Sequence, residues 1–225
     1  MKRAPLFITG TGTGAGKTTL TALLARFLRQ NGQRVAALKP VCSGDRDDAH
    51  ALASALGGDL TLDEINPWHF RAPVAPVVAA RREKKRVSLA EIVSHVRPMQ
   101  KRFDWVLIEG AGGLLSPLCE KTDSRDLIAA LRATPIIVGP NRLGAINELR
   151  LTLAALPPAK QAKAIIVLMS PAQTDAATRT NAALLAEYFE AGRILRLPWL
   201  GQPVNWEAVL KSARVRQMLD IGLGL

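Results

Sequence analysis

The sequence predicts an α/β fold in three layers, with helices flanking a mostly parallel central sheet. Two observations predict it. Short apolar runs alternate along the chain with amphipathic stretches of helical period, and a glycine-rich loop joins the first run to the first stretch. The 225 residues, 48% of them hydrophobic, suffice for one sizeable core. Because no Ser/Gly-rich or charge-rich linker divides the chain, we expect a single domain over residues 1–225.

Six short apolar runs are predicted to form the strands. They are residues 6–8, 35–38, 105–108, 135–138, 165–168 and 193–197. Runs of this kind without alternation are typical of parallel strands buried on both faces. The first run is too short for a signal peptide and leads directly into the glycine loop. No segment reaches the roughly 18 apolar residues of a membrane span, and we expect a cytoplasmic protein with no membrane partner.

Helices are predicted between these strands. Apolar residues recur at helical spacing from Leu20 to Leu28, and Asn31-Gly32 is expected to end that helix with a left-handed residue. Ser88 to Glu91 form a capping box before another helix. Further helices are expected at 47–57, 124–132, 143–156 and 174–189, with a final one from about residue 204. Three prolines between Asn66 and Pro76 predict a loop there rather than regular structure.

The strongest functional motif is the segment GTGTGAGKTT, residues 10–19, between the first strand and the first helix. Alternate glycines let the backbone curl so that its N–H groups point at phosphate oxygens, and the helix N-terminus adds positive potential. Lys17 is expected to reach the β- and γ-phosphates, and the Thr18 hydroxyl suits Mg²⁺. The strict pattern has glycine where this chain has Thr11. The segment is therefore a variant P-loop, and the expected fold is that of the P-loop NTPases.

Two acidic residues and a second lysine are predicted to complete this site. Glu109 follows the strand at 105–108, and an acid at the carboxyl end of a central parallel strand faces the ligand crevice. Asp48 lies beyond the second strand, and carboxylates with a Thr hydroxyl are ligands that Mg²⁺ accepts. Lys39 ends the second strand in the motif KPVCSG and can stabilise charge on a transferred phosphoryl group. Taken alone, either acid also fits a helix cap, and Lys39 a surface lysine.

Composition excludes other classes of site. The formal charge of +11 favours anionic partners, but the densest basic cluster, residues 81–86, has no interleaved aromatic residue. We interpret it as a solvated loop, and a nucleic-acid partner is not expected. Cys42 and Cys119 are too few for a disulfide framework, and the three histidines have no metal-ligand spacing.

Taken together, the motifs resemble those of the dethiobiotin synthetases. They occur in that family's order: the P-loop with its Gly-Thr-x-Thr start, KPVCSG, Asp48 before Ala-His-Ala-Leu, EGAGG at 109–113 and NRLGAIN at 141–147. The loop NPWHF at 66–70 and the late LPWL at 197–200 also fit. The resemblance runs from about residue 5 to 205, nearly the whole chain.

The resemblance implies a homodimeric ligase of biotin synthesis. Such enzymes join CO₂ to 7,8-diaminopelargonate and close a cyclic urea, dethiobiotin, at the expense of ATP. A carbamate forms on one amine, its oxygen attacks the γ-phosphate, and the second amine then attacks the carbamic-phosphoric anhydride and expels phosphate. Positioning and electrostatics dominate such a reaction.

The resemblance also assigns roles to individual residues. It gives Lys17 and Lys39 a catalytic role, and it makes Thr18, Asp48 and Glu109 the ligands of Mg²⁺. The nucleotide-binding set is Gly14, Ala15, Gly16, Lys17, Thr18, Thr19, Asp48, Glu109, Gly110, Ala111, Gly112, Leu197, Pro198 and Trp199. Thr13 and Ser43 would contact the diamine end of the substrate. Gly144 and Asn147, at the start of a helix, would bind its carboxylate tail across the subunit interface, and a helix N-terminus suits a carboxylate. No Asn stands at 169–171, where the family reads adenine, so looser base selection is expected.

Two other functions remain open at this point. The first is a related ATP-using enzyme of another cofactor pathway that acts on a different amine or carboxylate. Gly14, where the family often has an acidic residue near the diamine, keeps that substrate question open. The second is a ParA- or MinD-like switch ATPase that binds DNA or membrane, although those proteins usually carry a lysine where this chain has Gly12.

Overall fold

A six-stranded parallel sheet forms the centre of the molecule in this computed structural model, which describes residues 3–224. The strands are β1 (Leu6–Gly10), β2 (Val35–Leu38), β5 (Trp105–Glu109), β6 (Thr134–Pro140), β7 (Ile165–Met169) and β8 (Ile194–Leu197), in the order β2-β5-β1-β6-β7-β8. Every neighbouring pair is parallel. The predicted α/β class and all six predicted strands are confirmed, with ends moved by one or two residues.

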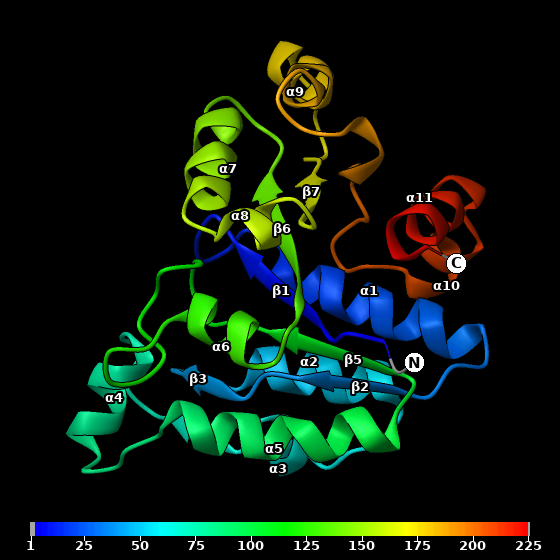
Figure 1. Cartoon of the computed structure of the whole chain (residues 1–225). Coiled ribbons are helices and arrows are strands. Elements are labelled where there is room, and N and C mark those ends of the chain that lie inside the picture. Colours follow the sequence, from blue (N-terminus) through cyan, green and yellow to red (C-terminus); the bar gives the residue numbers. More distant parts are fainter. Residues whose placement is uncertain (1–2, 225) are drawn as a thin grey trace.

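Helices cover both faces of this sheet, so the chain folds in three layers (Figure 1). The longer helices are α1 (Lys17–Gln30), α2 (Asp47–Leu56), α4 (Pro76–Arg82), α5 (Leu89–Arg102), α6 (Ser124–Ala130), α7 (Ala145–Ala154), α9 (Ala176–Ala186), α10 (Trp206–Lys211) and α11 (Ala213–Leu223). Figure 1 shows α1 and α2 together on one face, with α5 and α6 on the other. The core between these layers is mainly apolar, as at Phe7, Leu23 and Phe27, which have no exposed surface.

Local signals placed the helix ends well. Gly32 has φ 74° and ends α1 in the left-handed conformation, as predicted. The Ser88–Glu91 capping box forms in both directions at the start of α5. The tail was predicted as one helix but forms two, because Ser212 between them adopts an extended backbone (ψ 114°). Helix α4 was not predicted, nor were three short helical turns: α3 (Leu62–Ile65), α8 (Pro158–Gln161) and the 3₁₀ turn η1 (Ala191–Arg193).

The prediction of a loop throughout residues 66–76 was wrong. Strand β4 (Trp68–Phe70) lies within it and pairs in parallel with β3 (Val41–Ser43), which was not predicted. Pro67 stands just before β4, where a missing N–H costs no ladder hydrogen bond, and Pro76 is the first residue of α4. Strand β3 begins two residues after Lys39, so this small second sheet continues from the end of β2.

Candidate active site

The P-loop has a phosphate-binding shape set by its glycines. Gly14 and Gly16 have φ values of 74° and 97°, a left-handed backbone that other residues seldom adopt. At Gly16 a Cβ atom would also lie 2.9 Å from Cγ of Met169. Lys17 is buried, with 6% of the residue exposed. Its Nζ donates to the Gly12 carbonyl at 2.9 Å and so lies across the mouth of the loop.

A charged cluster lies at the carboxyl ends of β1, β2 and β5, beside the P-loop, with Lys39 and Glu109 buried and Asp48 half-buried. The Lys39 ammonium contacts Asp48 at 2.5 Å and Glu109 at 2.7 Å. The Thr18 hydroxyl lies 2.6 Å from Asp48 Oδ1 and 2.9 Å from Glu109 Oε1, and its single proton serves one of them at a time. Four of the five side chains that the sequence assigned to phosphate and metal are therefore in contact, although they come from α1, α2, β5 and the end of β2. The fifth, Lys17, is on the adjoining P-loop.

Burial and mutual attraction shift the pKa values in this cluster in different directions. Burial pulls the Lys39 pKa down, but the charges of Glu109 and Asp48 outweigh it and raise that pKa above its usual value. Burial likewise opposes ionisation of Asp48, yet Lys39 and the hydrogen bonds from Lys39 and Thr18 lower its pKa. Burial and the nearby Lys39 charge lower the pKa of Lys17. Lys39 and Asp48 thus stay ionised at neutral pH.

The same cluster fits a hard divalent cation. Glu109 Oε2 is buried and has no hydrogen-bond partner, which is the state expected of a carboxylate oxygen shaped for a further ligand. Within residues 3–224, no group of three or more His, Cys, Asp or Glu side chains could hold a metal on its own. Thr18, Asp48 and Glu109 would therefore share the cation with phosphate oxygens, as Mg²⁺ sites commonly do.

A cleft of about 450 Å³ opens beside the P-loop and provides room for a nucleoside. One wall is the loop itself, Gly14 to Gly16 and Thr19, and the other is the segment that follows β8, with Pro198 and Trp199. Leu197 was also predicted to bind the nucleotide, but its side chain is fully buried in the core. Its carbonyl accepts from Ser170 N at 2.9 Å, which fixes the floor of the cleft.

The segment 110–113 packs against the P-loop backbone. The N–H of Gly110 donates to Ile8 O at 2.9 Å, Ala111 is buried, and Gly112 has φ 66°. A Cβ on Gly113 would lie 3.5 Å from the carbonyl oxygens of Gly10 and Thr11. This segment shapes the loop through its backbone, and it carries no side chain that could bind a base.

The predicted substrate residues fall in two separate places. Thr13 is exposed on the P-loop, and Ser43, on β3, donates its hydroxyl proton to Val74 O at 2.5 Å. Gly144 and Asn147, exposed at the start of α7, instead line a groove of about 1050 Å³ between α7 and α9. That groove has no lining residue from the P-loop.

Two long-range contacts around the site were not predicted from the sequence, one between Thr11 and Glu148 and one between Asn141 and α9. Thr11 donates to Glu148 on α7, and Glu148 also binds Arg142. Asn141, buried at the end of β6, donates to Thr178 O and accepts from Asn181 Nδ2. Both contacts join segments that are more than 30 residues apart. Only the position of Asn141 at a strand end hinted at them.

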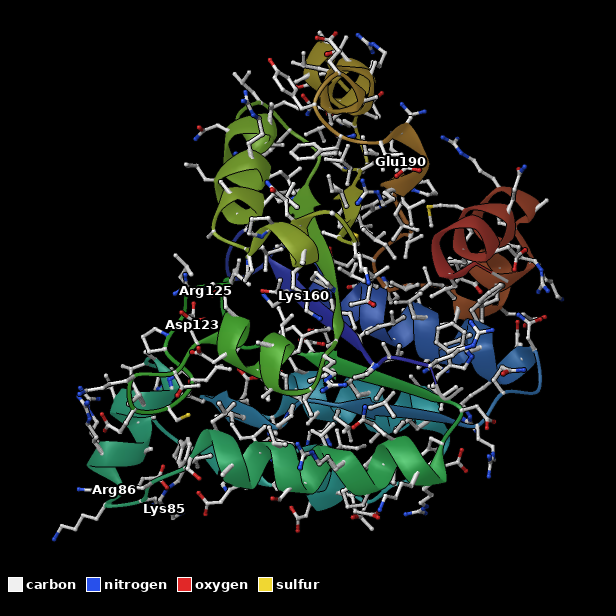
Figure 2. The ribbon with its side chains drawn as sticks, in the orientation of Figure 1. Lys85, Arg86, Asp123, Arg125, Lys160 and Glu190 are labelled. Carbon is white, nitrogen blue, oxygen red and sulfur yellow. The ribbon has the colours of Figure 1, made fainter. Side chains whose placement is uncertain are left out.

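The basic cluster at 81–86 lies away from this site. Arg81 and Arg82 end α4, so the interpretation as a loop was wrong for these two residues. Arg81 is paired with Glu120 at 2.5 Å, and Lys85 with Glu83 at 3.0 Å. Figure 2 shows Lys85 and Arg86 extending outward from the corner beside α4. Within the described part of the chain, no helix is long and apolar enough to cross a membrane.

Comparison with known proteins identifies the family. Residues 4–207 match a family model described as an AAA domain. A curated "ATP-dependent dethiobiotin synthetase BioD" from Anaeromyxobacter dehalogenans is 39% identical over 86% of this chain and 89% of its own length. A protein of the same name from Akkermansia muciniphila is 35% identical over 88% and 91%. The chain belongs to the ATP-dependent dethiobiotin synthetase family. It is therefore an enzyme of the ATP-dependent ligase class, and the resemblance predicted from its motifs is confirmed.

Solved structures agree on the fold. The chain is similar to a MinC:MinD cell division protein complex from Aquifex aeolicus, with a TM-score of 0.62, 16% identity, and coverage of 99% of this chain and 95% of that chain. A ParA family ATPase from Chlorobium tepidum gives a TM-score of 0.58 at 14% identity, with coverage of 99% and 100%. At these identities the likeness concerns the fold alone, and the predicted P-loop NTPase-like fold is confirmed.

Proposed function

We propose that this enzyme converts 7,8-diaminopelargonate, CO₂ and ATP to dethiobiotin, ADP and phosphate. The observation that carries the proposal is the convergence of Lys17, Lys39, Asp48 and Glu109 beside the P-loop, in a chain of this family. Two lysines at one phosphate site suit a reaction in which charge moves onto the transferred phosphoryl group.

The chain's own residues account for the proposed sequence of steps. One substrate amine attacks CO₂, releases a proton and becomes a carbamate. A carbamate oxygen attacks the γ-phosphorus and displaces ADP, while Lys17 and Lys39 hold the negative charge of the transferred group. The second amine then attacks the carbonyl carbon of the mixed anhydride, and phosphate leaves as the ring closes. Lys17 is the first residue of α1 and Lys39 directly follows β2, and both are buried, so little reorganisation is needed during the reaction.

Mg²⁺ is the proposed cation, held by Thr18, Asp48 and Glu109. When bound, it neutralises phosphate charge and orients the γ-phosphate. Before the cation binds, the Lys39 ammonium forms ion pairs with the carboxylates of both Asp48 and Glu109. A cation that takes over these carboxylates releases Lys39 from Asp48 and leaves its charge available for the carbamate and phosphate.

A homodimer is proposed because the substrate residues lie in two places. Thr13 and Ser43 belong to the phosphate side, whereas Gly144 and Asn147 line the groove between α7 and α9. The exposed apolar residues Leu143, Leu151, Leu184 and Tyr188 gather on the same groove. A second copy seated there would cover them and bring its own site close to Gly144 and Asn147. The cytoplasmic location predicted from the sequence remains part of the proposal.

The test is a product assay with the purified protein. ATP, Mg²⁺ and bicarbonate are supplied with or without 7,8-diaminopelargonate, and the cyclic urea is followed by mass spectrometry together with ADP release. We expect dethiobiotin and ADP in equal amounts only when the diamine is present. ADP release without the cyclic urea would contradict the proposed substrate and move the search to other amines.

A further inference from the structure

The carboxylate of Glu148 links the P-loop to the first turn of α7. Its Oε2 lies 3.3 Å from the Thr11 hydroxyl, and its Oε1 lies 2.6 Å from Nη2 of Arg142. Both oxygens are therefore engaged within one subunit. Thr11 stands where the strict P-loop pattern has glycine, so this side chain is an addition to the loop that phosphate binding does not require.

Packing fixes the side chain of Thr11 in the orientation that this link needs. A Cβ on Gly139 would lie 3.3 Å from the Thr11 methyl and 3.1 Å from Cδ2 of Leu149. The methyl group and Leu149 thus close over the bare backbone of Gly139, and the Thr11 hydroxyl is left to face Glu148. The Thr11 N–H also donates to Val138 O at 3.0 Å, which ties the loop to β6.

Arg142 carries the link to the loop in front of α7. Its Nη1 donates to Leu143 O at 2.9 Å and would lie 3.5 Å from a Cβ on Gly144, so the guanidinium folds over this turn. The Arg142 carbonyl accepts from Asn181 Nδ2 at 3.0 Å, and the same amide holds Asn141. The start of α7 is consequently attached to the P-loop on one side and to α9 on the other.

We propose that Glu148 is a positioning residue that braces the first turn of α7 against the P-loop and so holds Gly144 and Asn147 in place for the diamine substrate. The proposal rests on the proposed function, which gives Gly144 and Asn147 their ligand. Gly144 immediately precedes this turn, and Asn147 lies within it beside Glu148. A turn that loses its brace opens more often, and Gly144 and Asn147 then shift relative to the site that they complete, which weakens binding of the diamine and spares the chemistry.

An alternative role for Glu148 predicts a different response to substitution. A carboxylate near the P-loop could instead attract a substrate ammonium directly, through its charge. Glu148→Gln separates the two roles, because a carboxamide oxygen still accepts from Arg142 and its NH₂ still reaches Thr11, while the charge is lost. If Glu148 positions the turn, its role is kept in Glu148→Gln. If Glu148 binds a substrate ammonium through its charge, that role is lost.

The experiment compares Glu148→Ala, Glu148→Gln and Thr11→Val with Glu207→Ala, which removes an exposed ion pair with Lys211 on α10 and is the matched control. Initial rates are measured against diaminopelargonate and ATP separately. We expect Glu148→Ala to raise KM for the diamine about fivefold to tenfold, since it removes an ion pair and a hydrogen bond. The kcat and the KM for ATP stay unchanged, Thr11→Val shows a smaller rise in the same KM, and Glu148→Gln and Glu207→Ala behave like the parent protein.

Amide hydrogen exchange provides a readout that needs no substrate. The N–H groups of Ala145 and Glu148 donate to the carbonyl oxygens of Arg142 and Gly144. We expect these two amides to exchange faster in Glu148→Ala but not in Glu148→Gln or Glu207→Ala. An equal KM rise in Glu148→Gln and Glu148→Ala, an equal effect on ATP, or unchanged exchange in Glu148→Ala would each overturn the brace. If the parent protein makes no dethiobiotin, the proposed function fails, and the exchange data still decide whether Glu148 braces α7.

Discussion

The phosphate side of the molecule and the α7–α9 groove are built in opposite ways. On the phosphate side, Lys39 and Glu109 are almost completely buried, and each charged group already has a partner within the chain. In the groove, apolar side chains are left uncovered: Leu143 is 81% exposed and Leu151 63%. The first region is organised before any ligand arrives, whereas the second has surface that only another molecule can cover.

This difference indicates how substitutions in the two regions should affect the enzyme. Electrostatic catalysis depends on charges that are held in place before the reaction, so a single altered charge at the phosphate side should remove activity without removing the nucleotide. The groove contributes through association, so altering it should act on the oligomer first and on turnover only as a consequence.

The largest effect is expected for Lys39→Met. The substitution removes the charge that we place beside the transferred phosphoryl group, and turnover should fall by about 10²–10³-fold. Nucleotide binding, measured by titration calorimetry, should remain close to that of the parent protein, because Lys17 and the P-loop backbone are intact. Lys85→Met, which changes an exposed lysine far from the site, is the control. Turnover near the parent value in Lys39→Met would remove Lys39 from the mechanism.

The second-largest effect is expected for a charge introduced into the groove. In Leu151→Asp a carboxylate enters a surface that we expect a second copy to cover, and burial of an unpaired carboxylate costs on the order of several kcal/mol. Sedimentation should show a shift from dimer to monomer, and turnover should fall about 10–10²-fold with nucleotide binding retained. Leu115→Asp is the matched control, because Leu115 is 53% exposed and does not line the groove. A parent protein that sediments as a monomer would contradict the proposed dimer.

Parts of the molecule also differ in how far the sequence predicted them. The P-loop, Lys39 and Glu109 stand at the ends of locally recognisable strands, and parallel topology brings strand ends to one edge. Strands β3 and β4 have three residues each, and their pairing joins segments that no local pattern connects. The contact between Thr11 and Glu148 spans 137 residues. Such pairs depend on how helices dock on the sheet, and a single sequence does not record this.

A smaller effect on the phosphate side is expected from Asp48→Asn. The carboxylate that faces Thr18 and Lys39 becomes neutral, so the Mg²⁺ concentration for half-maximal turnover should rise on the order of tenfold. Asp47→Asn alters the preceding residue, which is exposed and lies outside the cluster, and should leave the Mg²⁺ dependence unchanged. Identical Mg²⁺ titrations for the two variants would contradict the assignment of Asp48 as a ligand.

The smallest effect concerns the nucleobase. The part of the phosphate side that would hold the base is lined by apolar side chains, as the groove is. The cleft wall is largely apolar, with Met169, Pro198 and Trp199, and the buried amide of Asn141 is occupied at both ends by Thr178 and Asn181. Sites that read a base by hydrogen bonds reject analogues strongly, whereas apolar sites discriminate weakly. We therefore expect kcat/KM for ATP, GTP and CTP to agree within about tenfold. Trp199→Ala should weaken all three alike, because stacking is available to every base. Strict use of ATP would contradict this prediction and would show that the cleft is as specifically organised as the phosphate site.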